Sequence, residues 1–90
     1  MIFETTEEMI MGVATRFKKI RKMKRITQIQ LSKMSNVSYG SIKRFERYGE
    51  ISLYSLTMLC QALDIPHEIK NLFNEVVFNN IDEVIRYGKA

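Results

Sequence analysis

The stretch formed by residues 27–47, TQIQLSKMSNVSYGSIKRFER, constrains the fold more than any other part of the chain. It begins with a Thr-x-x-Gln capping box, in which the Thr27 hydroxyl and the Gln30 side chain each satisfy a backbone N–H at a helix start. The helical pattern is interrupted at Asn36, whose side chain favours turns, and Ser38 then offers a new N-cap oxygen. The stretch therefore predicts two short helices joined by a tight turn, at residues 28–34 and 39–47.

The side chains of these two predicted helices divide into an apolar set and an outward set. The residues that would lock the helices together at a steep angle are Leu31, Val37, Ile42 and Phe45. The residues of the second helix that point elsewhere are Tyr39, Gly40, Lys43 and Arg44. Such a pair is a helix-turn-helix, whose second helix has a width suited to the major groove of DNA.

The rest of the chain is also predicted to be helical. A Thr-x-x-Glu box at Thr5 predicts a first helix at residues 6–24, Ser52 caps a fourth helix, and Pro66 begins a fifth. The first helix has an apolar stripe that should face inward, formed by Ile10, Val13, Phe17 and Ile20. Its opposite face carries the cations Arg16, Lys18, Lys19, Arg21 and Lys22.

The predicted fold class is all-α, a compact five-helix domain with a short additional C-terminal helix. The fourth helix carries an apolar stripe formed by Leu53, Leu56, Leu59, Cys60 and Leu63. The fifth helix carries Ile69, Leu72, Phe73 and Val76, and the last helix begins near Asp82 and contains Val84 and Ile85. We expect one domain over residues 1–90, with a core at about 6–65 and an extension at 66–90 that covers the core or contacts a second subunit or a partner.

Five short motifs within residues 16–65 resemble the Xre/Cro repressor family of helix-turn-helix regulators. They are Thr27-Gln28, Leu31-Ser32, Val37-Ser38, Ile42 and Phe45-Glu46. Ser32 stands where the family usually has Ala, and Gly49 follows the Glu at a greater distance than is usual. The resemblance implies a lambda-repressor-like fold and a sequence-specific regulator of transcription that binds double-stranded DNA.

A narrower resemblance is carried by residues 37–46, VSYGSIKRFE, together with a later Leu-Phe and an Ile-Asp-Glu-Val-Ile tail. These features are similar to the small HipB-like regulators that accompany HipA-type kinases. The resemblance implies an antitoxin that represses its own operon and has a HipA-like kinase as its partner. The kinase activity would belong to the partner, so this chain is predicted not to be an enzyme.

The basic residues of the chain are concentrated on the predicted helix-turn-helix. Residues 16–47 contain 11 Lys and Arg residues and one acid, which gives this segment a charge of +10 within a total of +4. The segments on either side of it, residues 1–15 and 48–90, each carry −3. A basic run is often only a solvated face, but here it coincides with a motif that must meet phosphates.

The sequence nominates nine residues for contact with DNA. They are Gln28, Ser38, Tyr39, Gly40, Ser41, Lys43, Arg44, Lys19 and Arg21. Arg44 is the first choice for reading a base, since a guanidinium can donate two hydrogen bonds to O6 and N7 of guanine. Gln28 and Ser38 stand at helix starts, where side chain and backbone can hold phosphates. Glu46 would be repelled by DNA and is expected to make a structural contact.

Catalysis, metal binding and membrane insertion find little support in the sequence. The single histidine, His67, has no Cys near it, and a metal site needs three or four ligands. We therefore expect no catalytic residue, no metal and no cofactor. Cys60 is the single cysteine, no apolar run approaches the roughly 18 residues of a membrane span, and the N-terminus lacks a secretory pattern. The expected location is the cytoplasm.

Several functions remain open at this point. One recognition helix covers few base pairs, so a homodimer on a two-fold operator is expected. The competing class is a protein-binding adaptor or antitoxin module that neutralises a partner without binding DNA, although an adaptor has no need of the concentrated basic charge. A phage-type repressor or an activator would share the same DNA chemistry, and the sequence does not separate repression from activation.

Overall fold

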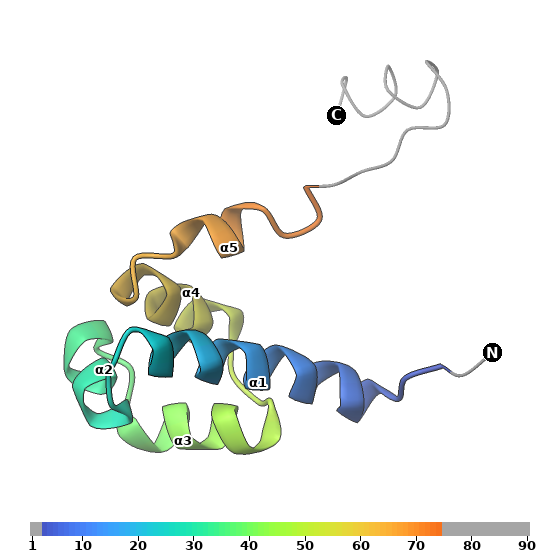
Figure 1. Cartoon of the computed structure of the whole chain (residues 1–90), viewed down its shortest axis with the longest axis horizontal. Helices are drawn as coiled ribbons and strands as arrows, with labels where there is room; N and C mark the ends of the chain where they lie inside the picture. The colour runs from blue at the N-terminus through green and yellow to red at the C-terminus, as the bar shows by residue number, and fades with distance from the viewer. Residues whose placement is uncertain (1–2, 75–90) are drawn as a thin grey trace, which may run out of the picture.

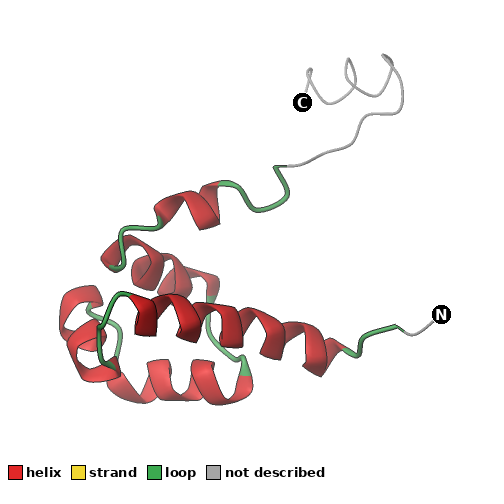
Figure 2. Ribbon diagram, viewed as in Figure 1, coloured by secondary structure: helices red, strands yellow, loops and turns green. Residues whose placement is uncertain are grey.

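The computed structural model describes residues 3–74, which form five helices (Figure 1). They are α1 (Thr6–Met23), α2 (Gln28–Ser35), α3 (Tyr39–Tyr48), α4 (Leu53–Ala62) and α5 (Pro66–Lys70). Loops join the helices, and no strand occurs among these residues (Figure 2). The predicted all-α class is therefore confirmed. The boundaries of α1, α2 and α3 lie within one residue of the predicted ones, and α4 begins directly after its predicted cap, Ser52.

The starts of α1 and α2 are fixed by the two predicted capping boxes. Thr5 Oγ1 accepts from the backbone N–H of Glu8 at 3.1 Å, and Glu8 Oε1 accepts from the N–H of Thr5 at 3.1 Å. Thr27 and Gln30 make the same reciprocal pair, at 3.1 and 2.8 Å. A cap of this kind contributes about 1 kcal/mol, so the sequence sets both helix starts locally.

The ends of α2 and α3 both adopt a left-handed backbone. Asn36 ends α2 with φ 63°, and Gly49 ends α3 with φ 78°. Position 49 requires glycine for a further reason, because a Cβ added there would lie 2.9 Å from Cγ1 of Ile10. The end of α3 therefore presses against α1 without an intervening side chain.

The hydrophobic core lies among α1, α2, α3 and α4. The helices α1 and α3 run side by side in opposite directions, and α2 joins them at one end (Figure 1). The ring centres of Phe17 and Phe45 are 5.3 Å apart in an edge-to-face arrangement, which is the favoured geometry for aromatic pairs. The buried apolar residues are Ala14, Phe17, Leu31, Val37, Ile42, Phe45, Leu59, Cys60, Leu63 and Ile65.

Two residues predicted to face the core do not. Val13 is 42% exposed and Leu53 is 63% exposed. On α1 the inward line runs through Ala14 and Phe17, and one residue of helix rotates a side chain by about 100°, which moves Val13 to the edge. Leu53 lies in the first turn of α4, where the helix has not yet reached the core.

The fifth helix is shorter than predicted. It ends at Lys70, so Leu72 and Phe73 lie in the turn that follows it. Phe73 has φ 59° and is 91% exposed, whereas Ile69 packs against the core. Val76 and the short last helix expected near Asp82 lie outside the described residues.

The largest correction concerns Arg21, which was expected on the cationic outer face of the first helix. It is buried, with 6% of its surface exposed, and its guanidinium binds Glu46 of α3 through two hydrogen bonds. Nε donates to Oε2 at 2.7 Å and Nη2 donates to Oε1 at 2.8 Å. Nη1 also donates to the carbonyl oxygen of Ile26 at 2.8 Å. Arg21 therefore lies in the interior of the fold, and the structural role expected for Glu46 is confirmed.

We predict that Arg21→Ala lowers the free energy of unfolding by roughly 3–5 kcal/mol, because it leaves the Glu46 carboxylate buried without its partner. Denaturant unfolding followed by circular dichroism measures this. Lys22→Ala, at the exposed neighbouring position, is the control and should stay within about 0.5 kcal/mol of the original. A loss of less than about 1 kcal/mol for Arg21→Ala would show that the pair does not hold α1 to α3.

Candidate nucleic-acid interface

The start of α3 is a cap built from two of the nominated residues. Ser38 Oγ accepts from the backbone N–H of Ser41 at 3.1 Å and donates to Ser41 Oγ at 2.7 Å. Both hydroxyls are therefore engaged in fixing the helix start. The backbone N–H groups of a first helical turn lack partners within the helix, so this end of α3 can offer donors to an anion.

One face of α3 points directly away from the core. Gly40, Arg44 and Arg47 follow one another at spacings of four and three residues, and all three are exposed. The opposite face carries the buried residues Ile42, Phe45 and Glu46. The outward face is therefore free of packing contacts with the core and is rich in positive charge.

Gly40 lies in the middle of this outward face. A Cβ added there would meet nothing within 4 Å, in contrast to the crowded Gly49. The fold itself does not need glycine at this position. A helix without a side chain at this point allows another molecule to approach the backbone closely.

A shallow depression beside α3 joins residues from three helices. It is lined by Lys18 of α1, Gln28 of α2, and Tyr39, Lys43, Glu46 and Arg47 of α3. Lys43 Nζ stands 4.7 Å from the centre of the Tyr39 ring. The carboxylate of Glu46 already binds Arg21, so the three cations leave the depression positive and suited to an anion.

Gln28 ties the start of α2 to α3. Its Nε2 donates to Oε1 of Glu46 at 2.9 Å, and the residue is only partly exposed. The same carboxylate oxygen accepts from Arg21, so three helices meet at one carboxylate. One amide hydrogen of Gln28 is used by this bond, and its other polar atoms remain for a contact at the surface.

The comparisons with known proteins agree with this geometry. A protein-family model described as helix-turn-helix matches residues 17–70, which is more than half of the chain. The chain belongs to the helix-turn-helix family. No curated protein and no solved structure matched the chain. The family consists of DNA-binding transcriptional regulators of the Xre and lambda-repressor type, so α2 and α3 form the helix-turn-helix and α3 is its recognition helix.

Two residues at the helix-turn-helix surface were not nominated from the sequence. They are Lys18 and Arg47, which line the depression with Gln28 and Lys43. Arg47 could have been found, since it lies seven residues after Gly40 and so shares its side of the helix. Lys18 has no local signal, because only the packing of α1 against α3 brings it to this surface.

Lys19, which was nominated, lies elsewhere. It is exposed, but it is rotated by about 100° from Lys18 and does not line the depression. Lys18 and Lys22 are four residues apart and share one flank of α1. The structure therefore brings Lys18 to the recognition helix and leaves Lys19 on the outer side.

Arg44 has an acidic neighbour that the sequence did not single out. Its Nη2 donates to Oε1 of Glu50 at 3.0 Å, and the two side chains are 65% and 56% exposed. A second depression surrounds this pair, lined by Ser41, Arg44, Glu50, Ile51, Ser52 and Ser55. Arg44 is thus oriented at the surface by a partner that lies just beyond the recognition helix.

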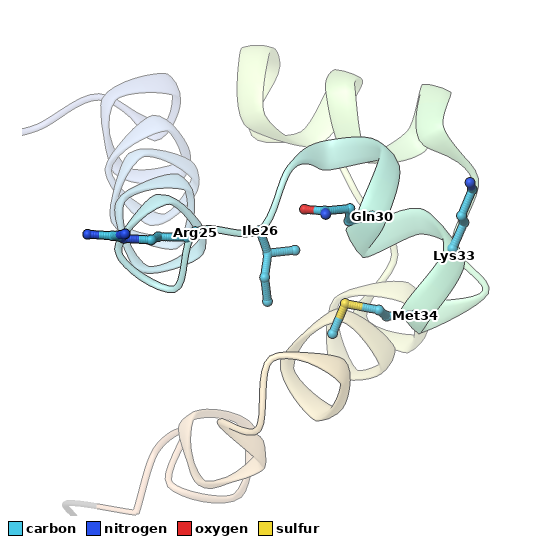
Figure 3. Close-up of a pocket in the computed structure, with 5 residues that line it drawn as sticks. All are labelled: Arg25, Ile26, Gln30, Lys33 and Met34. Atoms are coloured by element: carbon cyan, nitrogen blue, oxygen red, sulfur yellow. The ribbon is translucent and has the colours of Figure 1, made fainter.

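A third depression lies on the far side of α2 from the recognition helix. Its lining residues are Arg25, Ile26, Gln30, Lys33 and Met34. Figure 3 shows that Ile26 and Met34 reach towards the space between them, whereas Arg25 and Lys33 extend away from it in different directions. The two cations do not converge on one point, so this depression is not arranged to hold an anion.

Residues 3–74 show no arrangement typical of a metal site or a membrane span. No three of their His, Cys, Asp and Glu side chains are grouped to hold a metal ion. None of their helices combines the length and the apolar character needed to cross a membrane.

Burial, followed by the charge of Glu68, raises the pKa of the Cys60 thiol, which therefore stays protonated at neutral pH.

We predict that Gly40→Ala affects folding and DNA binding in opposite directions. Alanine should raise the free energy of unfolding by up to about 1 kcal/mol, because it restricts the unfolded chain and meets no obstacle in the fold. The new methyl group should weaken binding to duplex DNA, because it keeps another molecule from approaching the helix backbone closely. Denaturant unfolding and fluorescence anisotropy measure the two effects, and unchanged DNA affinity would show that Gly40 is not at the contact.

Proposed function

We propose that the chain represses transcription of its own operon by binding a two-fold operator as a homodimer. The observation that carries this proposal is the outward face of the recognition helix, with the depression of Lys18, Lys43 and Arg47 beside it. A helix inserted in the major groove needs an outward face that does not pack against the protein core. It also needs cations at the edges of that face to contact the two phosphate backbones. Both requirements are met by the same surface.

The residues of this surface divide into two roles. Arg44 reads a guanine, and Gly40 lets the helix lie close to the base edges, because both point straight out from α3. The phosphate contacts come from Lys18, Lys43 and Arg47. The remaining nominated residues at this surface hold it in place or meet the backbone at its edge, namely Gln28, Ser38, Tyr39 and Ser41. Lys19 lies on the outer side of α1 and has no contact role in this proposal. Arg21 is removed from the nominated set, because its guanidinium is buried and fully engaged.

The dimer contact is proposed at an apolar groove between α1, α4 and α5. The groove has a volume of about 310 Å³ and is lined by Val13, Arg16, Phe17, Ile20, Leu56, Cys60, Ile65, Glu68, Ile69 and Leu72. A second copy is the occupant that fits, since Arg16 and Glu68 at this groove are opposite charges that can pair reciprocally across a two-fold axis. The extension at residues 66–90 supplies one wall of the groove through its first residues.

A HipA-like kinase is the second partner that we propose, and it rests on the resemblance of residues 37–46 to HipB-like regulators. An antitoxin that only binds a protein would share the exposed apolar groove. It would have no use for the cations gathered around the recognition helix. A DNA-binding protein therefore accounts for more of this surface than an adaptor that binds protein alone.

The test begins with selection of a preferred duplex from a random pool, followed by titration of that site and of random DNA. We predict that Arg44→Ala costs roughly 1–3 kcal/mol on the selected site and little on random DNA. Lys18→Ala should weaken both by a similar factor. It should also flatten the log–log salt dependence by about 0.9, the value for one phosphate.

The outcomes distinguish residues that read a base from residues that contact phosphates. Equal losses on both DNAs for Arg44→Ala would show that this residue only holds the backbone. Lys33→Ala is the matched control, because this exposed lysine does not line the depression with Lys18 and should change neither affinity by much. Absence of binding to any duplex at low salt would contradict the proposed function as a whole.

We predict that Val13→Glu converts the dimer into a monomer, because it places a charge inside the apolar groove. Val13 is partly exposed, so the substitution should leave the fold intact. Met23→Glu is the matched control, since it adds the same charge to an exposed position of α1 that does not line the groove. Sedimentation velocity distinguishes the two, and a Val13→Glu protein that remains dimeric would place the contact elsewhere.

A further inference from the structure

We propose that Glu50 determines the specificity of the recognition helix by directing Arg44 to a base and away from phosphates. The proposal rests on the proposed function, in which Arg44 reads a guanine. The observation that supports the proposal is the hydrogen bond that Nη2 of Arg44 donates to Oε1 of Glu50, at 3.0 Å. The two residues are six positions apart and belong to different segments of the chain, the helix and the loop that follows it.

The position of Glu50 is imposed by the backbone. Gly49 ends α3 in the left-handed conformation, and its N–H donates to the carbonyl oxygen of Phe45 at 2.7 Å. This cap turns the chain sharply, so the next residue lies beside the last turns of the recognition helix. The backbone therefore places residue 50 beside Arg44 whatever its type. The fold does not require a carboxylate at this position.

Stability does not explain this carboxylate. Both side chains are more than half exposed, and exposed ion pairs contribute about 0–1 kcal/mol or nothing measurable. Residues 16–50 contain two acids, and the other, Glu46, is buried against Arg21. Glu50 is thus the exposed acid of a surface that must meet a polyanion, and it weakens general attraction to DNA.

The chemistry of the pair favours bases over phosphates. A guanidinium has five N–H groups; Glu50 takes one of them, and a guanine takes two through O6 and N7. Because the guanine acceptors are neutral, they can share the guanidinium with a carboxylate. A phosphate bound to Arg44 would bring a second full negative charge next to the Glu50 carboxylate, and the two negative charges would repel each other. Glu50 also restricts the orientation of the guanidinium before DNA arrives, which lowers the entropy lost on binding.

The experiment compares Glu50→Gln with the original protein on the selected duplex and on random DNA. Glutamine keeps the size of the side chain and removes the charge. We expect affinity for random DNA to rise and its log–log salt slope to steepen by about 0.9, because Arg44 is then free to contact one more phosphate. The ratio of specific to random affinity should fall about fivefold or more. Glu4→Gln is the control, since it removes one exposed negative charge far from the recognition helix in sequence and should leave the ratio unchanged.

A second variant shows whether Glu50 acts through Arg44. In an Arg44→Ala background, Glu50→Gln should no longer steepen the salt slope. An unaltered specificity ratio in Glu50→Gln, or the same ratio change with and without Arg44, would overturn the role of Glu50. In that case the Arg44→Ala result on the original protein still supports the proposed function. A protein that prefers no duplex over random DNA would overturn both.

Discussion

The buried ion pair between Arg21 and Glu46 is the interaction on which the arrangement of the helix-turn-helix depends. Arg21 comes from α1 and Glu46 from the recognition helix, and the same carboxylate accepts a hydrogen bond from Gln28 at the start of α2. The guanidinium also binds the carbonyl oxygen of Ile26 in the loop between α1 and α2. Three helices and one loop are therefore held in register by two charged side chains.

A buried pair of this kind contributes orientation more clearly than stability. Taking two charges out of water costs several kcal/mol per ion, and the attraction between them offsets that cost only when the geometry is good. Here both carboxylate oxygens and all three guanidinium nitrogens have partners. A wrong crossing of α1 and α3 would leave these charges unpaired, so the pair favours one relative position of the helices.

The charged residues near α3 divide into those that stabilise the fold and those that are exposed and available to DNA. Glu46 and Arg21 neutralise each other in the interior, while Lys18, Lys43 and Arg47 stand around the depression above them. Glu50 is placed at the far end of the recognition helix, beside Arg44. The distribution of acids is thus as informative as the concentration of bases, since each acid near α3 has a defined cationic partner.

Local chemistry determined the helices of this protein, and tertiary packing determined its surface. The capping boxes at Thr5 and Thr27 and the left-handed glycine at Gly49 act over a few residues, so the sequence alone predicted the boundaries of α1, α2 and α3. A run of cations on α1 looks uniform in sequence, because exposure depends on which side of the helix its neighbours cover. Only the packing of α1 against α3 buried Arg21 and brought Lys18 to the recognition helix, since both depend on contacts between residues far apart in the chain.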